Sequence, residues 1–480
     1  MKAGFCTTDI TPAIGMEKPG GYGKAYCLAI HDPLQARAAV FEDGDTRVAL
    51  VGLDTLVIAE RTVAAIRAEI EKRCGIPASN ILIAASHTHV GGPLFGHFPD
   101  QYEDAPKLIQ SLIADHSTIP DLLYHDWVIK QAASAIIEAD RKKQDAVLCV
   151  DSGHQENVAF NRRLRMQHGK AVSHPGKGNP GIIDYAGPID PEVGVVGAWS
   201  QQGEFLGCVV NYTCHCTTFG GAVSADWVYH LDRTVRNVMG QQGVVVFLNG
   251  ACGDVTQVDN KSVALPQFPD SSARLVGVSV GAEALKVLNR AARGEFSTVA
   301  SVSRKMTFGR RTPSSARVAK AREIVEAGIH DEERRATTEW TFAKEVLILD
   351  YLAGQTPEVE GEIQAIQLGP VVYLANPAEY FCGLGLKIKE GSQFPFTYVV
   401  ELANGIIGYV PDEEAFSATG GGYETVLTSY SNLEVTAGTQ IADACVELSR
   451  QLQPTAAPEP PKMEPATAMW GYGQLGPELE

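Results

Sequence analysis

Residues 81–93 read ILIAASHTHVGGP, and the whole chain can be interpreted outward from this stretch. The apolar run Ile81–Ala85 has the length of a strand and passes directly into polar residues and a Gly-Gly-Pro turn. It predicts a buried strand that leaves the core and delivers side chains to a cleft. His87 and His89 are one residue apart, so both imidazoles share a face if the strand continues. Imidazole is the commonest metal ligand and also a routine buried polar group, so this pair alone leaves both roles open.

The same change from apolar strand to polar turn occurs twice more. His215 follows the apolar run 209–212 and precedes two threonines and two glycines, and the run 244–248 leads into the turn 249–256. Open α/β sheets place their ligand sites at the carboxyl ends of strands. Three such strand ends, two of them with histidines, therefore predict a single site.

Apolar strands alternate with helical patterns in the front half of the chain. Residues 47–53 predict a strand, and Glu60–Cys74 predicts a helix with one apolar face that stops at Gly75. We expect an α/β fold of mixed, largely buried β-sheets flanked by helices. Further helices are expected at 127–140, 271–293 and 441–452, and further strands at 147–150, 362–374 and 396–402.

Domain boundaries follow from the same patterns. Residues 1–452 are expected to form one domain, with a polar helical insertion at about 310–352. Proline is dense after residue 453, so 453–480 is expected to be an extended tail.

Composition narrows the function classes. A chain of 480 residues that is 45% hydrophobic can bury a large core, and its formal net charge of −17 disfavours nucleic-acid and anionic-membrane surfaces. We expect a small neutral or cationic substrate, no nucleic acid and no stable membrane association, and leave a homo-oligomer open. No basic start with an apolar run and no membrane-length apolar stretch is found, so we expect a cytoplasmic protein without signal peptide or anchor.

The ten cysteines show no disulfide framework. Cys214 and Cys216 flank His215, which invites a thiolate metal site. Side chains alternate along a strand, however, so both thiols should point away from His215. We expect reduced core cysteines.

Other polar residues have ordinary structural interpretations. Asp226 precedes a helical run and is expected to be its N-cap. His97 could line the entrance of a site, although a surface imidazole is the default. The basic cluster 162–165 is typical of a solvated face, although it could also meet a carboxylate-bearing substrate. Asp54 is equally compatible with a turn and with a role in orienting a histidine.

Five motifs, in order, resemble those of the neutral ceramidase catalytic domain. They are ASHTH at 85–89, the segment 211–217 around His215, the turn 249–256, NPAE at 376–379 and GYV at 408–410. The opening DITP at 9–12 and the segment 31–38 agree with the same family, and the resemblance runs from about residue 3 to 452.

This resemblance implies a single zinc ion held by His87, His215, Glu379 and Tyr409. Nitrogen and oxygen donors with room for a water are typical of a catalytic zinc site. Without the resemblance, Glu379 would be interpreted as a carboxylate at a helix start after Pro377.

The resemblance also implies catalytic roles. His89 is a non-ligand histidine that handles a proton, and Tyr423 and Arg162 are donors near the scissile group. Zinc lowers the pKa of a bound water to about 7 and polarises a carbonyl, which suits amide hydrolysis.

Two departures from the family bear on mechanism and substrate. Thr256 stands where family members carry a serine discussed as a nucleophile, and Gln257 follows it instead of proline. A secondary alcohol is more crowded, so a metal-activated water is favoured over Thr256 as nucleophile. We also expect a short form without the family's carboxyl-terminal immunoglobulin-like domain and export signal, which disfavours ceramide as the substrate.

The sequence thus predicts a zinc-dependent hydrolase that cleaves an N-acyl or lactam-type amide of a small soluble substrate by a metal-activated water. The alternatives are a metal-dependent ester or lactone hydrolase, and an inactive ceramidase-like binding protein. Fold analogy alone is a weak guide to substrate.

Overall fold

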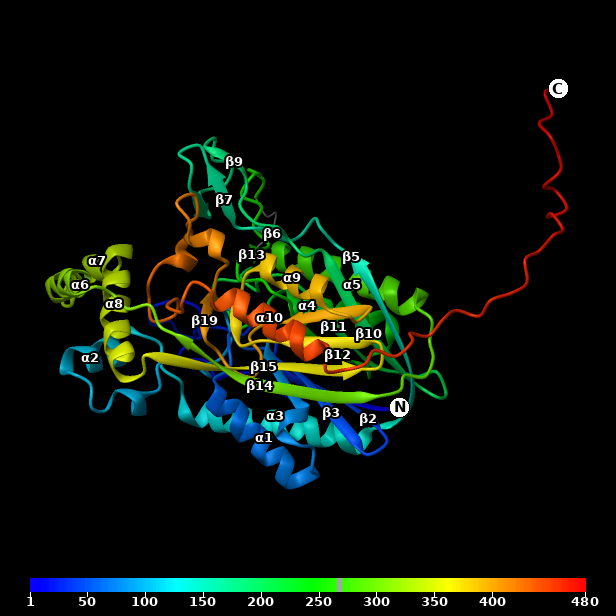
Figure 1. The fold of residues 1–480 in the computed structure, drawn as a ribbon, viewed down its shortest axis with the longest axis horizontal. Helices are drawn as coiled ribbons and strands as arrows, with labels where there is room; N and C mark the ends of the chain where they lie inside the picture. Colours follow the sequence, from blue (N-terminus) through cyan, green and yellow to red (C-terminus); the bar gives the residue numbers. More distant parts are fainter. Residues whose placement is uncertain (266–269) are drawn as a thin grey trace.

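The computed structural model describes residues 1–265 and 270–480. Two β-sheets pack face to face at its centre, and helices cover their outer faces (Figure 1). The larger sheet has the order β12-β11-β10-β5-β1-β2-β3-β4, and the smaller sheet has the order β14-β15-β16-β18. The predicted α/β class with buried mixed sheets is confirmed.

The strands of the larger sheet are β1 (Lys2–Asp9), β2 (Gln35–Asp43), β3 (Thr46–Leu53), β4 (Ile81–Ala85), β5 (Gln144–His154), β10 (Glu192–Ser200), β11 (Phe205–Tyr212) and β12 (Val244–Asn249). Those of the smaller sheet are β14 (Val299–Gly309), β15 (Glu358–Leu368), β16 (Val371–Ala375) and β18 (Phe396–Val400). The covering helices are α1 (Glu60–Cys74), α3 (Leu122–Lys142), α4 (Trp227–Met239), α5 (Ser271–Arg290), α9 (Cys382–Gly391) and α10 (Ala437–Ser449).

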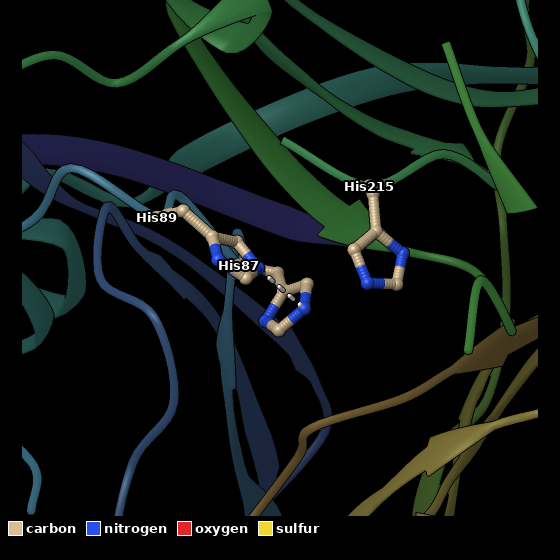
Figure 2. Close-up of side chains that lie close together, drawn as sticks. All are labelled: His87, His89 and His215. Atoms are coloured by element: carbon tan, nitrogen blue, oxygen red, sulfur yellow. Dashed lines mark hydrogen bonds between the residues drawn. The ribbon is translucent and has the colours of Figure 1, made fainter. Parts of the chain in front are cut away.

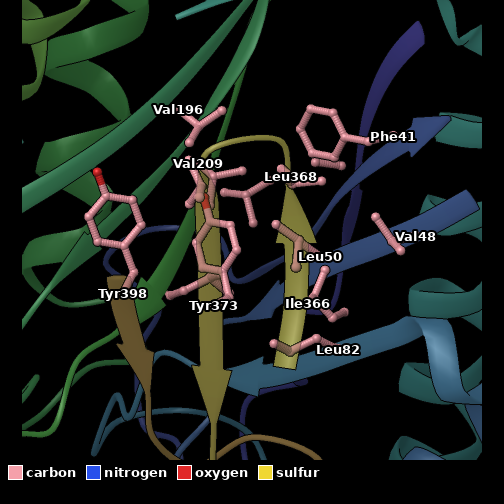
Figure 3. Close-up of a cluster of buried hydrophobic side chains, with 14 of the residues drawn as sticks. Phe41, Val48, Leu50, Leu82, Val196, Val209, Ile366, Leu368, Tyr373 and Tyr398 are labelled. Atoms are coloured by element: carbon pink, nitrogen blue, oxygen red, sulfur yellow. The ribbon is translucent and has the colours of Figure 1, made fainter. Parts of the chain in front are cut away.

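Strand alternation explains the layers. Phe41 of β2 and Leu50 of β3 point between the two sheets, where they join Tyr373 of β16 (Figure 3). Their neighbours Val40 and Val51 point to the other face and pack with α1 and α3. Because both faces are buried, these strands are continuous apolar runs in the sequence.

The larger sheet coils so that its two edge strands, β12 and β4, come together. Strand β12 contacts β2, β3 and β4, and the Asn249 side-chain amide donates to the Ser86 carbonyl over 3.3 Å. We call this meeting of strand ends the seam. It explains why the carboxyl ends of β4, β11 and β12 lie close together.

Strands β3 and β12 are in close contact at Gly52, near the seam. A Cβ at Gly52 would lie 2.4 Å from the carbonyl oxygen of Phe247 in β12. We expect Gly52→Ala to lower the free energy of unfolding by about 1–3 kcal/mol in urea denaturation, because the strands must separate. Gly354→Ala is the matched control, since nothing lies within 4 Å of its Cβ position. Equal stability of the two variants would contradict this packing.

The region predicted as one strand at 362–374 is two antiparallel strands, β15 and β16. Gly369, with φ of 56°, and Pro370 form the turn between them, and a left-handed glycine followed by proline is a strong turn signal. Helix α3 begins earlier than predicted, because Asp121 caps it by accepting from the backbone N–H groups of Leu123 and Tyr124.

A helical lobe lies at one side of the molecule (Figure 1). It packs α2 (Lys107–His116) against the region of the predicted insertion, which forms α6 (Ser315–Gly328), α7 (Glu332–Arg335) and α8 (Thr338–Gln355). After α10, the first part of the predicted tail contacts the body: Thr455 donates its backbone N–H to the Gly369 carbonyl. Residues 459–480 are exposed and run away from the body. No helix in the described ranges is long and apolar enough to span a membrane.

Candidate metal centre

Three histidines converge at the seam (Figure 2). His87 and His89 follow β4, and His215 follows β11. The Nε2 atoms of His87 and His89 are 3.2 Å apart, and the ring centroids of His87 and His215 are 4.6 Å apart. One nitrogen from each ring lies within 4.8 Å of the others.

Backbone carbonyls fix the orientation of all three rings. The Nδ1–O distances are 2.9 Å from His87 to Leu56, 3.0 Å from His89 to Gly20, and 2.7 Å from His215 to Cys252. A carbonyl only accepts, so each Nδ1 carries a proton and each ring turns its Nε2 toward the centre. This is the arrangement of metal-binding histidines.

His87 has a strained backbone. Strand β4 ends at Ala85, and the φ of His87 is 67°, a conformation that costs of the order of 1–3 kcal/mol at a non-glycine residue. The sequence predicted that both imidazoles reach one site, and the structure brings them together through this left-handed residue instead of a continued strand.

Glu379 approaches the histidines from another part of the chain. It lies in β17 (Ala378–Tyr380), and Tyr409 is its partner in the parallel strand β19 (Gly408–Val410). Glu379 Oε2 is 3.2 Å from His87 Nε2 and 3.4 Å from His215 Nε2, yet it is buried and accepts no hydrogen bond of good geometry. The alternative of a helix-start carboxylate is wrong, because Glu379 is in a strand.

Arg162 joins the remaining candidates to this centre. It is 4% exposed, and its Nε donates to Glu424 over 2.7 Å. Nη1 lies 3.1 Å from His215 Nε2, and Nη2 donates to the Tyr409 hydroxyl over 3.2 Å. The Tyr423 hydroxyl is 2.8 Å from that of Tyr409.

The solvated-face interpretation of 162–165 is wrong for its first two arginines. Arg162 and Arg163 are both buried, because Glu424 pairs with the first and the ring of Phe381 packs on the second. Local charge density does not distinguish an exposed cluster from arginines that enter a site.

Electrostatics favour a cation at the centre. Burial opposes a charge on His87, but the Glu379 carboxylate raises the pKa of His87 above its ordinary value. Burial lowers the pKa of His89 to about 3, and burial together with Arg162 holds the pKa of His215 well below its ordinary value. The histidines in turn hold the pKa of the buried Glu379 well below that of a free carboxyl. The group is thus one carboxylate with imidazole lone pairs around it.

Thr256 directly follows Val255, whose carbonyl oxygen is 3.0 Å from His215 Nδ1. It is buried in β13 (Val255–Thr256), which pairs with β6 (Phe160–Asn161), and its hydroxyl donates to Gln257 over 2.9 Å. It is not among the residues that line the adjoining cavity.

The minor predictions have mixed outcomes. Asp226 is the N-cap of α4, as predicted. Asp54 pairs with buried Arg37 over 2.7 Å and orients no histidine. Cys214 and Cys216 are buried free thiols in the apolar cluster around Trp227, as predicted.

A cavity of 550 Å³ opens beside the histidines. His89, Glu379, Tyr409 and Tyr423 line one part of it. His97 also lines it, and its Nδ1 is 2.7 Å from the Tyr102 hydroxyl, so the alternative of a cavity-lining His97 agrees with the structure and the default surface position does not.

Sequence reasoning missed several groups that support the site. Glu424 holds Arg162, and its position beside Tyr423 was a usable signal. Glu401 accepts from the backbone N–H of Tyr380 over 2.8 Å and of Cys252 over 2.9 Å, so it joins β17 to the turn after β12. No local pattern marked Glu401.

No protein-family model matches the chain. The neutral ceramidase of Pseudomonas aeruginosa is 27% identical over 197 residues, which is 40% of this chain and 26% of that protein. The matched region thus spans about a quarter of the relative's length.

Solved structures extend the similarity to nearly the whole fold. A ceramidase complexed with C2 matches with a TM-score of 0.68 and 18% identity, over 95% of this chain and 77% of the other. Neutral ceramidase from P. aeruginosa matches with a TM-score of 0.68 and 19% identity, over 95% and 76%. These matches show that the chain shares the fold of neutral ceramidase.

Proposed function

We propose that this protein is a zinc-dependent hydrolase that cleaves an amide bond of a small soluble substrate in the cytoplasm. The observation that carries the proposal is the meeting of three Nε2 lone pairs with the unpartnered Oε2 of Glu379. All three Nδ1 protons are committed to carbonyls, and the Glu379 carboxylate beside the Nε2 atoms makes the space between these groups suit an added cation.

The donor set fits zinc. Imidazole nitrogens and a carboxylate oxygen are the common protein ligands of a catalytic zinc. His87, His215 and Glu379 would hold the ion, with Tyr409 completing the set from the neighbouring strand. Zinc in such a site supplies Lewis acidity, which polarises a carbonyl and acidifies water.

The remaining groups suit the charge that develops when an amide is cleaved. Arg162 and Tyr423 present donors toward the tetrahedral oxyanion, and Glu424 holds the guanidinium in place. His89 lines the cavity and its Nδ1 is held by the Gly20 carbonyl, so its Nε2 is the atom that would take a proton from water and give it to the departing amine.

Similarity and charge support the substrate class. The proteins that this chain resembles are named ceramidases, and their name denotes cleavage of an amide. A net charge of −17 disfavours an anionic membrane surface as the source of substrate. The direct test is to screen N-acyl compounds, lactams and matched esters for hydrolysis by the zinc-loaded protein, where turnover of esters alone would overturn amide specificity.

A variant at His89 distinguishes a zinc ligand from a residue that carries a proton. We expect His89→Ala to keep its zinc and to lose about 10²–10⁴-fold in kcat/KM, because general acid–base catalysis contributes about that much. Metal analysis and steady-state kinetics on the same preparation check this. His125→Ala, outside the cavity, is the control. Loss of zinc from His89→Ala would make His89 a ligand.

A further inference from the structure

The cavity beside the metal centre has a charged wall. Apart from the centre itself, it is lined by two acidic residues, Glu60 and Glu345, and two arginines, Arg61 and Arg310. Three of these four are paired. The pairs are Glu60 with Lys305 (2.7 Å), Arg61 with Asp100 (2.7 Å) and Glu345 with Lys344 (2.9 Å).

Arg310 has no such partner among the described residues. It directly follows β14, where the helical insertion begins. Its Nε donates to the Thr356 carbonyl over 2.9 Å and its Nη1 to the Asn432 side-chain oxygen over 2.6 Å. Among residues 1–265 and 270–480, Arg310 has no carboxylate within ion-pair distance and Nη2 has no hydrogen-bond partner, and the residue lines the cavity.

This arginine is partly desolvated without compensation. Burial lowers the pKa of Arg310, whereas carboxylates raise the pKa of Arg37, which is paired in the same fold. A guanidinium has five N–H donors and stays charged, and here two of the five are used. The remaining donors on Nη1 and Nη2 form the edge that grips a carboxylate with two parallel hydrogen bonds.

We propose that Arg310 binds a carboxylate on the substrate, so that the protein acts on small amides that also carry a carboxylate. This inference rests on the proposed function of the same site. A phosphate would call for more donors than one guanidinium edge, and the cavity wall offers no second unpaired cation among its described residues.

The overall negative charge does not contradict this. It led to the expectation of a neutral or cationic substrate, but charges beyond about 8 Å are largely screened at physiological salt. A cation inside a partly desolvated cavity acts at contact distance, where it decides binding.

Arg311 provides a matched control in the next position. Among the residues that the structure describes, it also lacks a carboxylate partner, and it donates to the carbonyls of Leu433 (2.7 Å), Ser431 (3.3 Å) and Thr425 (3.5 Å). Its guanidinium packs over Phe416, and it does not line the cavity. Removing its charge therefore tests buried-arginine loss without changing the cavity wall.

The experiment is calorimetric binding to zinc-loaded wild type, Arg310→Gln, Arg310→Lys and Arg311→Gln. The probes are N-acetylglycine and its longer ω-amino acid homologues, each compared with its carboxamide. For at least one chain length, wild type and Arg311→Gln should bind the carboxylate about tenfold or more tightly than the carboxamide, as expected for a charged hydrogen bond. Arg310→Gln should lose this preference, and Arg310→Lys should retain part of it.

Equal binding of acid and carboxamide by wild type at every chain length would overturn the proposal, whatever the variants do. A preference that survives in Arg310→Gln would overturn it as well. Hydrolysis of the same probes separates the two proposals. Carboxylate binding through Arg310 without turnover of any amide leaves the anion site standing and refutes the hydrolase, whereas turnover without acid preference does the reverse.

Discussion

Glu379→Gln is expected to purify without zinc and to lose about 10³-fold or more in kcat/KM. The estimate takes about 4 kcal/mol as the share of a metal ion in transition-state stabilisation. Glutamine has the same shape, and its amide N–H can donate to the Nε2 lone pairs of His87 and His215, which are 3.2 and 3.4 Å from the present carboxylate oxygen. The variant thereby satisfies these lone pairs without a cation and should fold normally.

The measurement is elemental analysis of protein purified without added metal. Wild type should contain about one zinc per chain, and His87→Ala and His215→Ala should lose it as Glu379→Gln does. Glu362→Gln is the control, since it removes a carboxylate from an ion pair with Arg67 that is remote from the cavity. Zinc retained at full occupancy in Glu379→Gln would remove this residue from the ligand set, and a wild type that takes up no zinc would leave a binding protein as the better description.

Arg162→Met is expected to reduce the free energy of unfolding by about 3–5 kcal/mol. The loss follows because Glu424, which is fully buried, would keep its charge without its partner at 2.7 Å. Activity should fall by about 10²–10³-fold as well, because a donor to the oxyanion is missing. Urea denaturation and kinetics measure the two effects separately.

The double variant Arg162→Met with Glu424→Gln separates stability from catalysis. Removing both charges should restore most of the stability, since no uncompensated buried charge remains. It should not restore activity, because the guanidinium beside Tyr423 is still absent. Recovery of both properties together would show that Arg162 serves only to neutralise Glu424.

Local patterns revealed the parts of the site that lie at strand ends. The strand that ends before His87 and the strand that ends before His215 were visible in the sequence, because a buried strand followed by a polar glycine turn is a short-range signal. The turn at Gly369 was also encoded locally, although the flanking apolar residues suggested one long strand.

The remaining parts depend on contacts that no local pattern contains. Glu379 and Tyr409 meet only because β17 and β19 pair, and their assignment in the sequence rested wholly on family resemblance. Arg162 was predicted near the scissile group by that resemblance, whereas its charge cluster suggested solvent. The roles of Glu401 and Arg310 depend on which residues the tertiary fold places next to them.

The seam has a consequence for when the proposed metal site forms during folding. Ser86 and Asn249 meet across it although 163 positions separate them. His87 and His89 closely follow Ser86 in the chain, and the same Asn249 amide donates to the carbonyl of Cys214, which precedes His215. Contacts between such distant residues form late, because the entropy of closing a long loop must be offset by other structure first. Nascent or partly folded chains would therefore lack the complete ligand set, and zinc uptake would mark the final stage of folding.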